Sequence, residues 1–173
     1  MLTVNKHLPA GRGLARALRE RAATLTLDWD TRGKSRFDAH DSSGRHVAVF
    51  LPRGAVLRGG DMLVAEDGSF LRVQAAPQPV LQVRACAAHG TPTDLLRAAY
   101  HLGNRHVQLE VQADCLQFEP DPVLADMLRR LHLIVSEAQS PFEPEAGAYG
   151  EGHAHAHGHD HDHAHGHDHP HGH

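Results

Sequence analysis

Hydrophobic and polar residues alternate in several short stretches of the first half of the chain, and helical periodicity is weak there. Successive side chains of a strand point to opposite faces of a sheet, so this alternation predicts half-buried strands. Residues 13–23 favour one or two helical turns, and a turn is expected at 66–68. We therefore predict a small all-β domain over residues 1–74. Its strands are expected at 24–29, 45–51, 62–64 and 70–73.

The pattern changes after a proline-rich segment at 75–79, which we interpret as the joint between two domains. Beyond it, strands alternate with amphipathic helices. The first helix is expected at 95–102, with capping residues at 91–94 before it and Gly103 as its left-handed end. The second helix begins at Asp121-Pro122 and carries one apolar stripe. The strands of this part are expected at 80–85, 106–111, 115–118 and 133–135.

This order of elements predicts the fold class α+β, with a ferredoxin-like βαββαβ domain over residues 75–140. A sheet of this type buries one face under its two helices and leaves the other face free for a partner. Residues 141–173 are expected to form a disordered, His-rich tail, because the segment after Gly150 has no large apolar residue with which to build a core.

Histidine dominates that tail: 11 of the 18 histidines of the chain lie in its last 23 positions, at every second residue. Gly and Ala between them let the backbone bend until neighbouring imidazoles share one ion. Imidazole with a few carboxylates suits Ni²⁺, Cu²⁺, Zn²⁺ and Co²⁺, and protons should compete for the imidazoles below about pH 6. The expected ligands are His153, His155, His157, His159, His161, His163, His165, His167, His169, His171 and His173.

The body of the chain carries no net charge. All 17 Lys and Arg residues precede residue 151, whereas four of the 21 acidic residues follow it, which leaves 17 charges of each sign in the body. Nucleic acids and anionic membranes both require a concentrated basic face, so neither is an expected partner. The N-terminus lacks the apolar run of a signal peptide, and no apolar run of about 18 residues occurs anywhere. We expect a cytoplasmic protein.

No residues of the body combine into a catalytic group, so we expect no enzymatic activity. Cys86 and Cys115 are too far apart in sequence for a Cys-x-x-Cys site and are interpreted as reduced core thiols. The chain has neither a Gly-x-x-x-x-Gly-Lys-[Ser/Thr] phosphate loop nor a His-Glu-x-x-His zinc motif. Asp121 and Asp126 are interpreted as a helix cap and a solvated position on a helix face.

Two histidines of the body, His101 and His106, flank the expected end of the first helix. Taken alone, His106 on the polar face of a strand is typical of a solvated side chain. If this region met a copy of itself about a two-fold axis, each His106 would lie beside its twin and form a bridging metal site. The other histidines of the body have no spacing that demands a metal and are interpreted as structural: His7, His40, His46, His89 and His132.

Several motifs follow one another through nearly the whole chain. The first domain contains Arg32-x-Lys34-Ser35-Arg36, Leu51-Pro52-Arg53-Gly54 and Leu57-Arg58-x-Gly60-Asp61. The second contains Tyr100-His101-Leu102-Gly103-Asn104-Arg105-His106, Val123-Leu124-x-x-Met127-Leu128 and Pro141-Phe142-Glu143-Pro144-Glu145-x-Gly147-Ala148-Tyr149. In this order and before a His-rich end, these motifs resemble the UreE family of urease accessory proteins, the nickel metallochaperones of urease maturation.

The resemblance implies a β-rich N-terminal domain likened to a peptide-binding module, a ferredoxin-like metal-binding domain, and a homodimer joined through the latter. His106 matches the histidine of the family's Gly-Asn-[Arg/Lys]-His motif, which pairs with its twin to hold one nickel or zinc ion. His101 occupies a position that is often glutamate in the family and is a supporting ligand. Some relatives have further histidines before the second helix, where this chain has Pro120 and Pro122. We expect the tail to replace them.

The function implied by the resemblance is nickel delivery. The tail captures Ni²⁺, with Zn²⁺ or Cu²⁺ as competing ions, and hands it by ligand exchange to the paired His106 residues. The dimer then passes it through the urease accessory GTPase to apo-urease. A flexible segment of this length spans roughly 26 Å, enough to fold back over its own domain. The alternative is a His-rich nickel or zinc storage or detoxification buffer, which would need only the tail.

Overall fold

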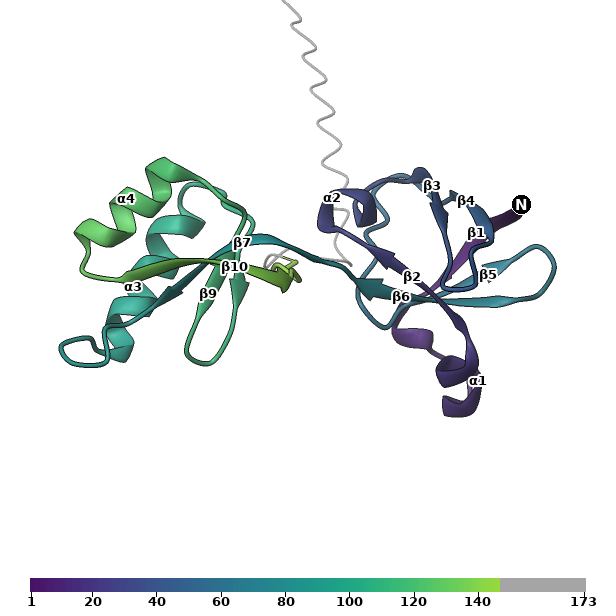
Figure 1. Cartoon of the computed structure of the whole chain (residues 1–173), viewed down its shortest axis with the longest axis horizontal. Helices are drawn as coiled ribbons and strands as arrows, with labels where there is room; N and C mark the ends of the chain where they lie inside the picture. The colour runs from purple at the N-terminus through teal and green to yellow at the C-terminus, as the bar shows by residue number, and fades with distance from the viewer. Residues whose placement is uncertain (147–173) are drawn as a thin grey trace, which may run out of the picture.

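The computed structural model of the chain describes residues 1–146 and has a mixed α+β architecture with two separate sheets (Figure 1). Strand β7 (Pro77–Arg84) leads from the first sheet into the second. No helix among the described residues is long and apolar enough to cross a membrane.

The first sheet has six strands in the order β2-β6-β5-β1-β4-β3. The pairs β1–β4 and β2–β6 are parallel and the other neighbours are antiparallel. Fully buried aliphatic side chains such as Val4, Leu25, Val49 and Leu71 form its core. The elements are β1 (Leu2–Leu8), η1 (Pro9–Gly11), α1 (Arg16–Arg21), β2 (Ala23–Leu27), α2 (Trp29–Arg32), β3 (Arg36–His40), β4 (His46–Phe50), β5 (Met62–Ala65) and β6 (Phe70–Ala75).

The alternation in the sequence found β2, β4, β5 and β6, and the short helix α1 lies within the predicted helical stretch. It missed β1 and β3. Strand β3 does alternate, with Phe37 and Ala39 packed against the core, but it has only these two apolar residues. The strand predicted at 24–29 ends early, because the Asp28 side chain accepts a hydrogen bond from the Thr31 amide at 2.8 Å and starts α2.

The second sheet has the order β10-β7-β9-β8 with all neighbours antiparallel. Its elements follow the predicted βαββαβ order: β7, α3 (Pro92–Gly103), β8 (Glu110–Val111), β9 (Leu116–Phe118), α4 (Pro122–Arg130) and β10 (Ile134–Pro141). Thr91 and Asp94 form a capping box at the start of α3, and Asp121 accepts hydrogen bonds from two amides at the start of α4, as predicted. Buried residues of both helices pack on the sheet, including Ala98, Leu102 and Leu128.

The proline-rich joint at 75–79 lies where the chain passes from the first sheet to the second, and Pro77 to Pro79 begin β7 and pair with the end of β10. Two other predictions for this part were wrong. The predicted strand at 106–111 shrinks to Glu110–Val111. Gly103 still belongs to α3, and the left-handed residue that follows the helix is His106, with φ at 56°.

Residues 141–145, here called the strap, were predicted to belong to the disordered tail but are packed against the first sheet's unit. Phe142 is fully buried and meets the Trp29 ring edge-on at 6.1 Å between centroids. Pro144 is buried as well. The strap is therefore ordered because the Phe142 ring packs against the Trp29 ring. The tail histidines lie outside the described residues.

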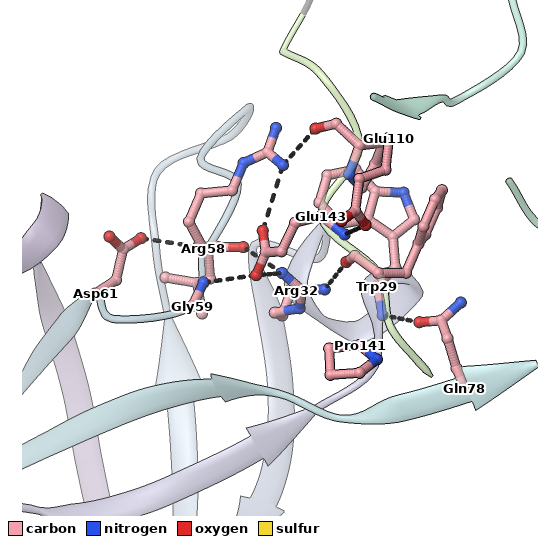
Figure 2. A network of polar contacts seen from close by, with 12 residues as sticks. Trp29, Arg32, Arg58, Gly59, Asp61, Gln78, Glu110, Pro141 and Glu143 are labelled. Atoms are coloured by element: carbon pink, nitrogen blue, oxygen red, sulfur yellow. Dashed lines mark hydrogen bonds and ion pairs between the residues drawn. The ribbon is translucent and has the colours of Figure 1, made fainter. Parts of the chain in front are cut away.

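Arg32 holds the strap in place (Figure 2). Its side chain is fully buried, and its guanidinium donates to Glu143 Oε1 at 2.7 Å and to the Phe142 carbonyl oxygen. The Gly59 amide donates to the same Glu143 oxygen at 2.8 Å, and Arg58 donates to the Pro144 carbonyl oxygen at 2.6 Å. A buried charge needs such partners, because its desolvation costs several kcal/mol.

The strap also contacts the second sheet's unit. The Glu143 amide donates to Glu110 Oε2 at 2.7 Å, and the Glu145 amide donates to the Leu109 carbonyl oxygen at 2.8 Å. Gln117, on the sheet face away from the helices, is fully buried beside Glu110. Through Glu110 on the edge strand β8, the strap contacts one border of that face, which was expected to be free for a partner.

Replacing Glu143 by Ala should lower the free energy of unfolding by about 2–3 kcal/mol, because the buried Arg32 loses its carboxylate. Urea unfolding followed by the fluorescence of Trp29, the single tryptophan, measures this directly. Glu145→Ala is the matched control, since the Glu145 contact with Leu109 is made by its backbone amide. Equal stability of the two variants would show that the ion pair does not hold the strap.

Candidate metal centre

His106 lies in a tight turn directly after helix α3. Its amide donates to the Gly103 carbonyl oxygen at 2.9 Å, and the Val107 amide donates to the Leu102 carbonyl oxygen at 3.2 Å. With φ of His106 at 56°, this pair of bonds is a Schellman motif with His106 at the left-handed position. The side chain is exposed. The turn therefore presents one imidazole to solvent from a backbone fixed by two hydrogen bonds.

A histidine at this position is unusual, since glycine is the residue that adopts a left-handed conformation at least cost. A side chain with a Cβ costs roughly 1–2 kcal/mol there. Strained residues of this kind cluster at functional sites, where the surrounding structure holds them. Gly103, the glycine that the sequence offered for this role, remains inside the helix.

His101 lies in the last turn of α3 and is half-buried. Its ring packs edge-on against Tyr100, with 5.6 Å between centroids. Its carbonyl oxygen accepts a hydrogen bond from Arg105 Nη1 at 2.9 Å, which ties the helix to the turn that holds His106. His101 thus supports the turn through its backbone, and no contact between the two imidazoles is observed within residues 1–146.

An apolar stripe lies exposed on the same helix. Leu96 and Tyr100 are four residues apart, so they lie on one face of α3, and their side chains are 70% and 67% exposed. Large apolar side chains exposed side by side commonly mark a contact surface. The stripe runs toward the end of α3 where His106 follows.

His132 ends helix α4 in the same way that His106 ends α3. Its φ is 60°, its amide donates to the Arg129 carbonyl oxygen at 3.0 Å, and the Leu133 amide donates to the Leu128 carbonyl oxygen at 3.2 Å. The two helices therefore close with the same motif and the same residue type. Replacing His132 therefore serves as a control for replacing His106, because both changes alter a turn of the same geometry.

The described residues contain no cluster of three or more His, Cys, Asp or Glu side chains placed to hold an ion together. Of the other histidines, His7 contacts Asp61 Oδ2 at 2.7 Å, and His40 and His46 face each other across β3 and β4. The eleven expected ligands of the tail lie outside residues 1–146.

Sequence reasoning missed one pair, Cys86 and His89. Cys115 is buried as predicted, and burial raises the pKa of its thiol. Cys86 is only partly buried, and its Sγ lies 3.8 Å from His89 Nδ1. The hydrogen bond with His89, followed by those from the backbone amides of Ala88 and His89, lowers the pKa of Cys86 to about 7. The spacing Cys-x-x-His was the signal that could have identified it.

In the metal-free protein, the lowered pKa of Cys86 should be visible in the pH dependence of its alkylation. Since the thiolate is the nucleophile, alkylation of Cys86 by iodoacetamide should rise with pH around a midpoint of about 7. His89→Ala should move that midpoint up toward the ordinary value of 9.0. Mass spectrometry of a Cys115→Ala background, which has a single thiol, measures the rate. His132→Gly, which removes a different histidine, is the control and should leave the midpoint unchanged. If His89→Ala also left the midpoint unchanged, His89 would not be the cause of the lowered pKa of Cys86.

Comparison with known proteins matches both halves of the chain. The family model described as UreE urease accessory protein, N-terminal domain, matches residues 4–76, and the corresponding C-terminal domain model matches residues 78–173. These ranges meet between the two sheets.

Proteins named urease accessory protein UreE are similar over most of the chain. The one from Methylibium petroleiphilum is 73% identical over 151 residues, which is 87% of this chain and 70% of the relative. The one from Paracidovorax citrulli is 67% identical over 152 residues, 88% of this chain and 72% of the relative. The one from Verminephrobacter eiseniae is 65% identical over 152 residues, which is 88% of this chain and 90% of the relative. The chain belongs to the UreE family of urease accessory proteins.

Proposed function

We propose that this protein is a cytoplasmic nickel metallochaperone that captures Ni²⁺ and donates it for assembly of the urease nickel centre. Membership of the urease accessory family supports a role in urease maturation. The observation that carries the nickel role is the exposed His106 on the rigid turn after α3. Neutral imidazole is a ligand that suits Ni²⁺, Zn²⁺ and Cu²⁺ alike.

One imidazole cannot hold an ion by itself, since transition metals in proteins take about four or more ligands. A second copy of the chain supplies the next ligand if the two copies meet about a two-fold axis near His106. The exposed apolar stripe of Leu96 and Tyr100 supports this homodimer, because burying it would favour association. In that arrangement the two His106 side chains share one ion, with His101 or other donors completing its coordination.

The strap supports a direct transfer from tail to His106. Its last residue, Glu145, is bonded to the carbonyl oxygen of Leu109, three residues after His106. Three residues span at most about 10 Å, so the strap ends close to the turn that holds His106. The eight residues from Glu145 to His153 reach up to about 28 Å when extended. The first tail histidines are therefore within reach of His106 of the same chain.

In the proposed cycle the tail collects Ni²⁺ in weak, exchangeable complexes, and the paired His106 residues take it over by ligand exchange. The dimer then passes the ion through the urease accessory GTPase to apo-urease. Acidification through about pH 6 should release tail-bound metal, because protons compete for the imidazoles.

A storage or detoxification buffer is the alternative. The composition of the tail favours it, since 11 histidines in 23 residues give capacity with no need for the body. It does not account for the exposed apolar stripe of Leu96 and Tyr100 on the helix that leads to His106. The two functions differ in whether His106 is needed when the tail is intact.

Calorimetric titration with NiCl₂ tests the role of His106. The chosen variant is His106→Gly, because glycine preserves the left-handed turn that alanine would strain. We expect the tightest binding step to disappear in this variant, while the many weaker steps remain. His132→Gly is the matched control and should keep the tight step. If His106→Gly binds like the unchanged protein, the assignment of His106 is wrong.

Removing the tail after Gly150 separates delivery from storage. The truncated protein should lose most of its nickel capacity but keep the tight step, and it should still support urease activation in nickel-replete cells. The full chain with His106→Gly should fail in the same cells although its tail is intact. Activation that depends on the tail but not on His106 would favour the buffer.

A further inference from the structure

The loop between β7 and α3 carries a pair of potential ligands away from His106. Cys86 and His89 lie three residues apart, with 3.8 Å between Sγ and Nδ1. They border a hollow of about 680 Å³ whose wall also includes Asp94 and His132. The proposed nickel cycle makes no use of this pair.

Local structure holds the two side chains together. The Gly90 amide donates to the Cys86 carbonyl oxygen at 2.7 Å, which closes the loop on itself. A Cβ at Gly90 would lie 2.5 Å from both the nitrogen and the oxygen of Cys86, so only glycine permits so tight a closure. The closed loop therefore keeps Cys86 and His89 on one short, tightly folded segment.

The separation of the two donor atoms suits a shared metal ion. Bonds of roughly 2.3 Å to sulfur and 2.0–2.1 Å to nitrogen at a tetrahedral angle place the two donors about 3.6 Å apart. The observed separation of 3.8 Å is slightly longer, and a small rotation of either side chain would bring the two donor atoms to this distance.

We propose that Cys86 and His89 form a thiolate–imidazole chelate for a borderline divalent cation of the Zn²⁺ and Ni²⁺ class. The bond from sulfur to the ion forms as the S–H bond breaks, and the proton leaves to solvent. Water fills the remaining positions. This site differs in chemistry from the tail, which has imidazoles and carboxylates and no thiol.

That chemical difference allows a test in the full-length chain, with every tail histidine present. Thiolate bound to Co²⁺ gives a charge-transfer absorption in the near ultraviolet, which imidazole and carboxylate ligands do not give. We expect the reduced, metal-free protein to show this band on titration with CoCl₂, and Zn²⁺ added afterwards to remove it. Cys86→Ala should abolish the band, and His89→Ala should weaken Co²⁺ binding at this site by tenfold or more.

Cys115→Ala is the matched control, since Cys115 is the other thiol of the chain and is fully buried. It should keep the band, as should His106→Gly, so the outcome does not depend on the proposed nickel cycle. Circular dichroism checks that each variant is folded. A wild-type protein without the band, or a band that survives Cys86→Ala, would overturn the proposal. A His89→Ala variant with unchanged Co²⁺ affinity would remove His89 from the site.

Discussion

The buried guanidinium of Arg32 is the constraint on which the arrangement of the two sheets depends. A cation in an apolar interior requires an anion and further acceptors, and here they come from the far end of the chain, at Glu143 and Phe142. Because the strap that carries them is also bonded to Leu109 and Glu110, one charge in the first unit fixes a segment across both. The guanidinium groups of Arg32 and Arg58 lie over the Trp29 ring, and the same ring packs against Phe142 of the strap.

This arrangement gives the strap a functional meaning. The described chain ends beside the segment that follows His106, so the tail begins near the place to which it is proposed to deliver metal. A flexible tail attached elsewhere would search a larger volume for the same histidine, since effective concentration falls with the length of the connection. Packing and placement thus explain the residues from Pro141 to Glu145, with no need for them to bind metal.

The proposed metal ligands differ in how firmly the backbone holds them. The tail offers many equivalent imidazoles, whereas His106 and the Cys86–His89 pair have fixed backbones, one in a Schellman motif and the other in a loop closed at Gly90. Fixed ligands suit selection and transfer, because their geometry does not have to be assembled each time an ion arrives. Exchangeable ligands suit capture. The proposed function calls for both kinds of ligand.

By itself, the sequence determined the βαββαβ order of the second unit, four of the six strands of the first sheet, the capping residues of α3 and α4, and the family, whose resemblance made His106 the principal candidate ligand. These depend on local chemistry: alternation, caps, and motifs read along the chain. Only the tertiary structure decided that His106 rather than Gly103 takes the left-handed position, that residues 141–145 are ordered, and that Cys86 meets His89. Each of those outcomes rests on a contact or a backbone angle, such as the one between Arg32 and Glu143, whose partners the linear pattern does not bring together.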